Sequence, residues 1–359
     1  FNITLTGSND APIATYVAAQ TTSEGNSPIS GQLTASDIDR DASGNSDVLS
    51  FSLFNAQFTD ASGSNAILVD ASGLALTPDA SGNFSAIPGL SIASSGAWSF
   101  DPSNPAYNSL KAGEQRQIRV NYRVSDAGGL SDNAVFVINL TGTNDAPVAT
   151  YSTAQAITED ALDASGAPRK LSGQLTSTDP DAGSIRTYSL IGAAIDGLNI
   201  DASGSWSFNP SAASYQSLKE GQQRIIPVTY AVTDEQGASS QNTFNITITG
   251  TNDLPIATSS LKSSLPAGSE DTPYTISRQA LLAGINDIDS GETANLIISG
   301  LVAKDNIGST ISPGDASGVN SLFIPIFDTS NSITAWTFTP PTNYAGQITI
   351  EYTISDGIG

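Results

Sequence analysis

The sequence contains no cysteine, methionine or histidine among its 359 residues. Disulfides, thiol chemistry and imidazole catalysis are therefore excluded, and the usual ligands of zinc are missing. Basic residues are scarce, because 13 lysines and arginines stand against 35 aspartates and glutamates, for a formal net charge of −22. Nucleic acid and anionic membrane surfaces attract positive charge, so we expect neither as a partner. No apolar run reaches the roughly 18 residues of a membrane span, so we expect no membrane insertion.

The residues that are present favour short strands joined by turns. Apolar and polar side chains alternate in segments such as 120–124, 135–140 and 244–248, which are rich in Val, Ile, Thr and aromatic residues. This period of two predicts strands, and only residues 277–282 suggest a short helical turn. The predicted fold class is therefore all-β.

A short linker motif returns three times along the chain. Ser or Thr followed by Asn-Asp-x-Pro occurs at Asn9, Asn144 and Asn252, each time after an alternating run that ends in Thr-Gly. The spacing is 135 residues between the first two copies and 108 between the last two. A fixed linker between units of this size predicts a tandem array of domains.

Further repeated motifs divide the chain into three β-sandwich units. Each unit has one tryptophan in an alternating strand, at Trp98, Trp206 and Trp336, and these equivalent positions are predicted to be core positions. About seven strands in about 110 residues fits an immunoglobulin-like sandwich. The predicted domains are 8–143, 144–251 and 252–359, with 1–7 as the last strand of a preceding domain and the third unit truncated before its last strand.

The first unit contains an insertion at about 41–95 that is predicted to add hairpins. Asp-Ala-Ser-Gly occurs seven times in the chain, and its Asp and Gly positions are those of a type I turn. These motifs begin at Asp41, Asp60, Asp70, Asp79, Asp163, Asp201 and Asp315. Phe54, Phe58 and Phe84 have no counterparts in the other units, so a ligand-binding or partner-binding face on this insertion is one open alternative.

Each unit carries acidic and amide residues in the same order. The linker Asn-Asp comes first, then an acid 14 to 18 residues later, then an Asp-x-Asp, and finally a single Asp after the tyrosine-bearing strand. The candidate metal ligands are Asn9, Asp10, Glu24, Asp37, Asp39 and Asp126; Asn144, Asp145, Glu159, Asp179, Asp181 and Asp234; and Asn252, Asp253, Glu270, Asp271, Asp287, Asp289 and Asp356. Such hard oxygen ligands, six to eight to an ion, suit structural Ca²⁺.

Sandwich topology predicts where these residues meet. The linker Asp, the Asp-x-Asp and the late Asp are expected at one end of a unit, and the glutamate at the other end, facing the next linker. One junction is expected to combine Glu24, Asn144, Asp145, Asp179, Asp181 and Asp234. The next is expected to combine Glu159, Asn252, Asp253, Asp287, Asp289 and Asp356.

These motifs resemble bacterial cadherin-like repeats. The first two units are similar to VCBS repeats, with closing signatures at 142–147 and 250–253, and the third is similar to the related cadherin-like repeat at 270–273, 286–289 and 352–357. The resemblance implies a secreted or surface-attached segment of a large repeats-in-toxin adhesin, stiffened by interdomain Ca²⁺. It implies neighbouring repeats as partners and no enzyme activity. Lateral self-association into a filament or biofilm matrix stays open as an alternative, and no distal target is indicated.

Overall fold

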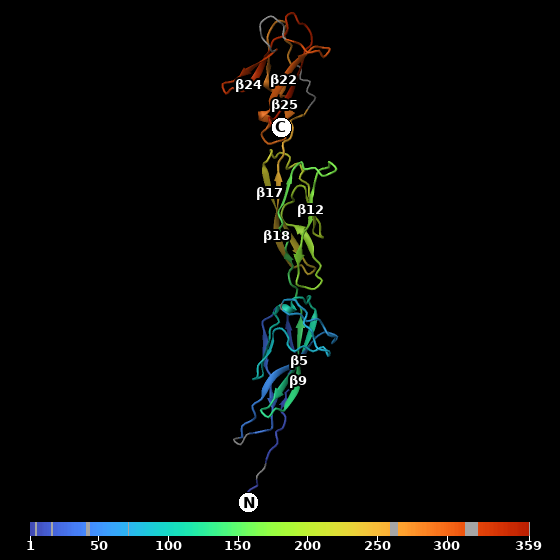
Figure 1. Cartoon of the computed structure of the whole chain (residues 1–359), viewed down its shortest axis with the longest axis vertical. Coiled ribbons are helices and arrows are strands. Elements are labelled where there is room, and N and C mark those ends of the chain that lie inside the picture. The colour runs from blue at the N-terminus through green and yellow to red at the C-terminus, as the bar shows by residue number, and fades with distance from the viewer. Residues whose placement is uncertain are drawn as a thin grey trace.

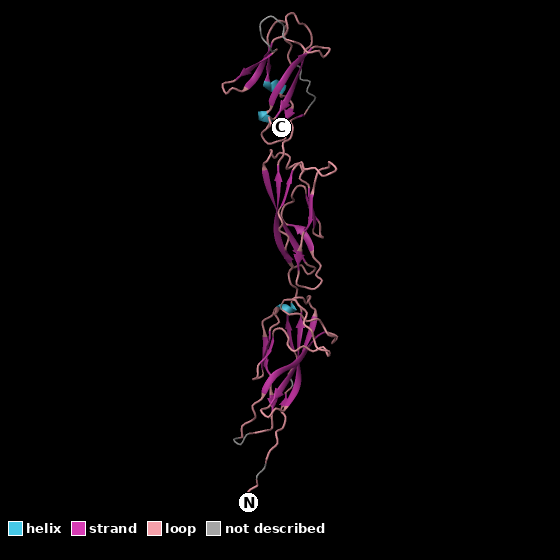
Figure 2. Ribbon diagram, in the orientation of Figure 1, coloured by secondary structure: helices cyan, strands magenta, loops and turns pink. Residues whose placement is uncertain are grey.

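The computed structural model describes residues 1–3, 6–15, 17–40, 44–70, 72–258, 265–312 and 322–358. Three β-sandwiches follow one another along the long axis, with the N-terminus at one end and the third sandwich at the other (Figure 1). Strands make up most of the regular structure (Figure 2). The predicted all-β tandem array is confirmed.

The first two sandwiches have the same strand order. The first sandwich contains β1 (Ile13–Ala14), β2 (Gln20–Ser23), β3 (Ile29–Gln32), β4 (Ala35–Ser36), β5 (Ser50–Asp60), β6 (Leu90–Ile92), β7 (Ala97–Phe100), the 3₁₀ turn η1 (Pro105–Tyr107), β8 (Gln115–Ser125) and β9 (Ser131–Thr141). The second contains β10 (Val148–Ala149), β11 (Gln155–Thr158), β12 (Leu171–Gln174), β13 (Ser177–Thr178), β14 (Thr187–Leu190), β15 (Leu198–Ile200), β16 (Ser205–Phe208), β17 (Gln223–Thr233) and β18 (Ser239–Thr249).

The third sandwich is a looser version of the same plan. It contains β19 (Ile256–Ala257), β20 (Tyr274–Ser277), the helical turn α1 (Arg278–Leu281), β21 (Ile285–Asn286), η2 (Thr293–Asn295), β22 (Ile297–Lys304), β23 (Phe323–Phe327), β24 (Ile333–Phe338) and β25 (Thr349–Ser355). The short helix was predicted at 277–282, and Ser277 caps it by accepting a hydrogen bond from the Ala280 amide.

The strands of each sandwich form two facing sheets. In the first sandwich the sheet orders are β2-β9-β8-β5 and β3-β7-β6, and in the second they are β11-β18-β17-β14 and β12-β16-β15. In each unit the first strand forms a separate two-stranded antiparallel ladder, as β1 does with β4. In the first two units the next strand pairs parallel with the last strand, as β2 does with β9 and β11 with β18, whereas β20 of the third unit pairs antiparallel with β24. The acid that follows β2 or β11 is therefore carried to the far end of its unit, next to the following linker.

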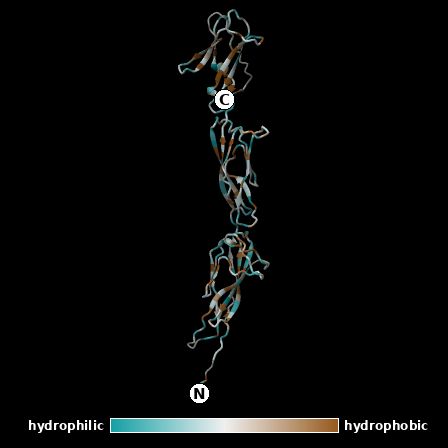
Figure 3. Cartoon of the chain, in the orientation of Figure 1, coloured by the Kyte–Doolittle hydropathy of each residue, from teal (hydrophilic) through white to brown (hydrophobic). Residues whose placement is uncertain are grey.

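Alternation along the strands places one face of each sheet in a core. Trp98, Trp206 and Trp336 are all buried, as predicted, and apolar residues concentrate on the strands (Figure 3). In the second unit, a Cβ on Gly173 of β12 would lie 2.7 Å from the indole nitrogen of Trp206. The shared Ser-Gly-Gln motif therefore has its glycine because the tryptophan ring packs directly on the backbone.

The Asp-Ala-Ser-Gly motifs form tight turns, both in the insertion of the first unit and in the second unit. At Asp60, Asp70, Asp79, Asp163 and Asp201 the Asp carbonyl accepts a hydrogen bond from the glycine amide three residues on, which confirms the predicted turns. The motifs at Asp41 and Asp315 lie outside the described residues, wholly or in part.

The aromatic residues of this insertion form no shared binding face. Phe58 and Phe84 are buried in the first core, so the predicted aromatic face is wrong for both residues. Phe54 is half exposed and its ring lies under the Arg123 guanidinium, 4.4 Å from the ring centroid. The two buried rings have no equivalents elsewhere because they belong to the insertion, which adds them to the core of the first sandwich.

Candidate metal centres at the domain junctions

At the first junction, the linker is held between the two sandwiches by carboxylates. The Thr143 amide donates to Oε2 of Glu24 at 3.1 Å, which ties the linker to the first sandwich. The Asp145 amide donates to Oδ2 of Asp181 at 3.0 Å, which ties the same linker to the second. A backbone hydrogen bond from Ala182 to the Ser109 carbonyl also crosses this junction, at 3.2 Å. The predicted residues from both domains therefore meet at one place.

The second junction repeats this arrangement. The Thr251 amide donates to Oε1 of Glu159 at 2.7 Å, and the Asp253 amide donates to Oδ2 of Asp289 at 3.0 Å. The Ser290 amide donates across the junction to the Ser217 carbonyl at 3.2 Å. We call this set of hydrogen bonds between the linker and its two neighbouring sandwiches the junction frame. Both junction frames use the linker motif and the Asp-x-Asp motif, so these two motifs define it.

The acidic and amide residues at the N-terminal end of the first unit make the same hydrogen bonds that the linker makes to the following domain at the two junctions. The Asp10 amide donates to Asp39 at 2.6 Å, and the Asp39 amide donates to Asp37 at 2.9 Å. Asn9 donates to Asp126 at 2.9 Å. Asn9 and Asp10 are exposed, whereas the corresponding linker residues at the two junctions are partly buried.

The linker asparagines have a defined orientation. The side-chain amide of Asn144 donates to Asp234 at 2.9 Å, and that of Asn252 donates to Asp356 at 3.0 Å. With the NH₂ group held in this way, the carbonyl oxygen of each side chain is left buried and without a hydrogen-bond partner. An amide fixed in this orientation offers an oxygen ligand to a cation.

Buried oxygens without hydrogen-bond donors concentrate at the two junctions. Glu24 and Glu159 are 5% and 0% exposed, and each has one carboxylate oxygen without a partner. Five other junction residues also have a buried carboxylate oxygen without a hydrogen-bond partner: Asp145, Asp181, Asp253, Asp287 and Asp289. A buried carboxylate oxygen without a donor is costly, so the set is suited to hold a cation that would be its partner.

The protonation equilibria reflect the same environment. Burial raises the pKa of Glu24 to about 7, and the carboxylates of Asp145 and Asp181 add to the rise. Burial raises the pKa of Glu159 to about 7, with further contributions from neighbouring acids. Burial and the nearby carboxylates raise the pKa of Asp253 to about 6. Clustered carboxylates that resist ionisation fit a site for a divalent cation, because the cation would stabilise the charged forms.

The second junction contains two groups of three carboxylates whose oxygens lie within 4.8 Å of one another. One group is Glu159, Asp253 and Asp289, and the other is Asp287, Glu292 and Asp356. Glu292 was missed by the sequence reasoning. Its signal is the spacing Asp287-x-Asp289-x-x-Glu292, which places a third acid three residues after the Asp-x-Asp.

Two predicted ligands lie away from these groups. Glu270 and Asp271 precede β20, and both are exposed. Asp271 accepts a hydrogen bond from the Asn343 amide at 2.7 Å. By position they correspond to Glu24 and Glu159, so their predicted role would apply to a following junction.

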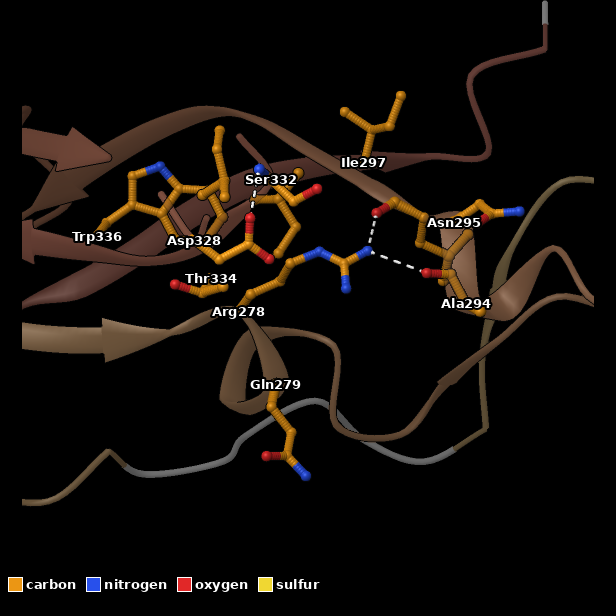
Figure 4. Close-up of a pocket in the computed structure, with 12 residues that line it drawn as sticks. Arg278, Gln279, Ala294, Asn295, Ile297, Asp328, Ser332, Thr334 and Trp336 are labelled. Atoms are coloured by element: carbon orange, nitrogen blue, oxygen red, sulfur yellow. Dashed lines mark hydrogen bonds between the residues drawn. The ribbon is translucent and has the colours of Figure 1, made fainter. Parts of the chain in front are cut away.

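The third sandwich has a surface groove that lies apart from the junction acids (Figure 4). Arg278 reaches into it, and its guanidinium donates to the carbonyls of Ala294 and Leu296. Asp328 accepts a hydrogen bond from the Ser332 amide at 2.9 Å. The charged groups of the groove therefore stabilise backbone and turn structure.

Comparison with known protein families finds two matching stretches. Residues 144–250 match the model of the bacterial cadherin-like domain, and residues 251–321 match the model of the cadherin-like domain. Residues 144–321 are therefore similar to cadherin-like domains. Such domains are extracellular structural and adhesion modules that generally bind Ca²⁺ at interdomain linkers.

Solved structures similar to the whole chain include cadherin repeats. Mouse Cadherin-23 EC22-24 is 17% identical, with 97% of this chain and 94% of that chain covered at a TM-score of 0.44. Protocadherin Gamma B7 extracellular cadherin domains 1-4 are 17% identical, with coverages of 96% and 75% at a TM-score of 0.42. No curated protein sequence matches this chain. Among the described residues, no helix is long and apolar enough to cross a membrane.

Proposed function

We propose that this chain is a calcium-stiffened extracellular segment of a bacterial surface adhesin, in which the tandem cadherin-like domains act as a stalk. The observation that carries the proposal is the repeated junction frame, in which both neighbouring sandwiches direct buried, unpartnered oxygens at the same linker. The match to a bacterial cadherin-like domain supports the bacterial and extracellular setting.

The junction residues fit calcium in the chemistry of their ligands. Carboxylates and a fixed amide carbonyl are hard oxygen donors, and each junction offers them from the linker, the preceding sandwich and the following sandwich. At the first junction these would be Glu24, Asn144, Asp145, Asp179, Asp181 and Asp234. At the second they would be Glu159, Asn252, Asp253, Asp287, Asp289, Asp356 and Glu292.

Bound calcium would supply positive charge where the chain has gathered negative charge. Without it, like charges on the two sandwiches repel and the linker between them is held by a few hydrogen bonds. With it, one ion shared by both sandwiches opposes bending at the linker. Each site would also add about 2.7 kcal/mol of stability at a free calcium concentration one hundred times the Kd.

Small-angle scattering of the full chain tests this proposal. We expect a longer and stiffer particle in millimolar calcium than in chelator, and calorimetric titration should detect calcium binding. The Asp145→Asn and Asp253→Asn variants should each weaken binding and allow bending at one junction. The matched control is Asp201→Asn, because Asp201 lies outside both junctions and its Oδ1 already accepts three hydrogen bonds within its own turn.

The result that would contradict the proposal is a wild-type chain that shows the same scattering curve in calcium and in chelator and gives no binding heat. Equal effects of Asp201→Asn and Asp253→Asn would also contradict it, because general charge screening would then explain any calcium effect.

A further inference from the structure

The two junctions share one backbone frame but differ in their acidic residues. Asp287-x-Asp289-x-x-Glu292 at the second junction corresponds to Asp179-x-Asp181-x-x-Ser184 at the first. The cross-junction hydrogen bonds from Ala182 to Ser109 and from Ser290 to Ser217 have the same length, 3.2 Å. Ser184 and Glu292 therefore stand at equivalent places, and the frame around them is the same.

Glu292 is a buried acid whose carboxylate lacks a complete set of partners. The residue is 5% exposed, its Oε2 has no hydrogen-bond donor, and Oδ2 of the neighbouring Asp287 has none either. The Lys219 ammonium lies 4.0 Å from Oε1 of Glu292, at the limit of an ion pair. Glu292 and Asp287 together with Asp356 form the second of the two carboxylate groups at this junction.

At the first junction the corresponding oxygens are already engaged. The Ser184 hydroxyl donates to Oδ2 of Asp179 at 2.7 Å, and the Asp181 amide donates to Oδ1 at 3.0 Å. Both oxygens of Asp179 thus have donors, whereas Oδ2 of Asp287 has none. At the first junction the neutral Ser184 hydroxyl is the partner of Oδ2 of Asp179. At the second junction a cation would be the partner of Oδ2 of Asp287.

We propose that the second junction binds one more calcium ion than the first, because Glu292 supplies a carboxylate where the first junction has Ser184. The inference rests on the proposed function, since it assumes that both junctions bind calcium at the group that includes Glu24 or Glu159. The extra ion binds at Asp287, Glu292 and Asp356. Asp160, where the first junction has Gly25, adds further negative charge beside the same linker.

The consequence is a stalk whose two joints respond differently to calcium. The second junction has more carboxylates, so the repulsion between its two sandwiches is stronger in chelator. Bound calcium would also hold its two sandwiches together more strongly. Positive charge does not distinguish the two junctions, because each has one lysine at the same place. Lys111 lies next to Gly183 at the first junction, and Lys219 lies next to Gly291 at the second.

Reciprocal substitution with calcium counting by native mass spectrometry tests the inference. Glu292→Ser should lower the number of calcium ions per chain by one, and Ser184→Glu should raise it by one. The double variant should return the wild-type number, because it moves the extra ion from one junction to the other. Glu220→Ser is the control, since Glu220 is exposed and its removal changes the charge equally near the second junction.

The outcomes separate this inference from the proposed function. If wild type binds calcium but the two single variants keep the wild-type number, the inference is overturned and the proposed function stands. If Glu220→Ser lowers the number as Glu292→Ser does, net charge rather than a ligand at position 292 is responsible, and the inference is again overturned. If wild type binds no calcium, the proposed function itself fails. Should Glu292→Ser fold poorly, the gain of an ion in Ser184→Glu still decides the question.

Discussion

Replacing Glu159 with glutamine should stabilise the chain in chelator and destabilise it in calcium. The Glu159 side chain is fully buried, with Oε1 accepting the Thr251 amide and Oε2 unpartnered beside Asp253 and Asp289. Glutamine has nearly the same shape, so its oxygen retains the Thr251 hydrogen bond. Its NH₂ group can donate to the neighbouring carboxylates, which removes both the buried charge and the repulsion.

The magnitude follows from the raised pKa. The folded-state pKa of Glu159 is about 7 and its ordinary value is 4.5. At 1.36 kcal/mol for each pKa unit, ionised Glu159 opposes folding by at most about 3 kcal/mol at pH 8, and solvent screening at the junction reduces this bound. We therefore expect Glu159→Gln to raise the free energy of unfolding by about 1 to 3 kcal/mol in chelator.

The pH dependence has a definite sign. Because the folded-state pKa is raised, the native protein binds more protons than the unfolded chain between pH 4.5 and 7. Lowering the pH through this window in chelator should therefore stabilise wild type, and the advantage of Glu159→Gln should disappear by about pH 4.5. In calcium the sign reverses, since the ion requires the ionised carboxylate and the amide is a weaker ligand.

Native-state hydrogen exchange of the amides in β11 and β18 is the suitable assay, because it reports the second sandwich separately from its neighbours. Wild type, Glu159→Gln and the control Asp201→Asn would be compared in chelator and in calcium, at pH 8 and pH 5. The reasoning would be refuted by a Glu159→Gln chain that is less stable than wild type in chelator at pH 8. A difference of the same sign and size in calcium and in chelator would refute it as well.

Three further predictions concern the cores. Phe58→Ala should destabilise the first sandwich by about 3 to 5 kcal/mol in urea unfolding, because the ring is 2% exposed, and a change below 1 kcal/mol would contradict its core position. Phe54→Ala should cost only about 0.5 to 1 kcal/mol in the same assay, since the half-exposed ring contributes mainly its contact with Arg123; a cost equal to that of Phe58→Ala would be the contrary result. Gly173→Ala should destabilise the second sandwich by about 1 to 3 kcal/mol, because the new methyl group would overlap the Trp206 ring, and an unchanged unfolding midpoint would show that the ring moves freely.

The sequence alone determined the architecture and most of the junction residues. Period-two patterns and turn residues specify strands locally, and repetition of the linker gives the number of units without any three-dimensional information. The positions of the junction acids followed from strand order, because each strand of a sandwich must begin and end at a known end of the unit. The assignment of these acids as calcium ligands stays a prediction, for which the buried, unpartnered oxygens now give a physical reason.

Only the tertiary structure decided which side chains face each other. The insertion has no repeated counterpart, so the sequence left a binding face at Phe58 and Phe84 open, whereas packing placed both residues in the core. Glu292 had no assigned role from the sequence, and the fold buries it beside Asp287. Burial and the pairing of oxygens depend on contacts between distant segments, and local sequence patterns do not encode those contacts. The sequence shows Ser184 and Glu292 at matching positions, but only the structure shows that both oxygens of Asp179 have donors and that Oδ2 of Asp287 has none.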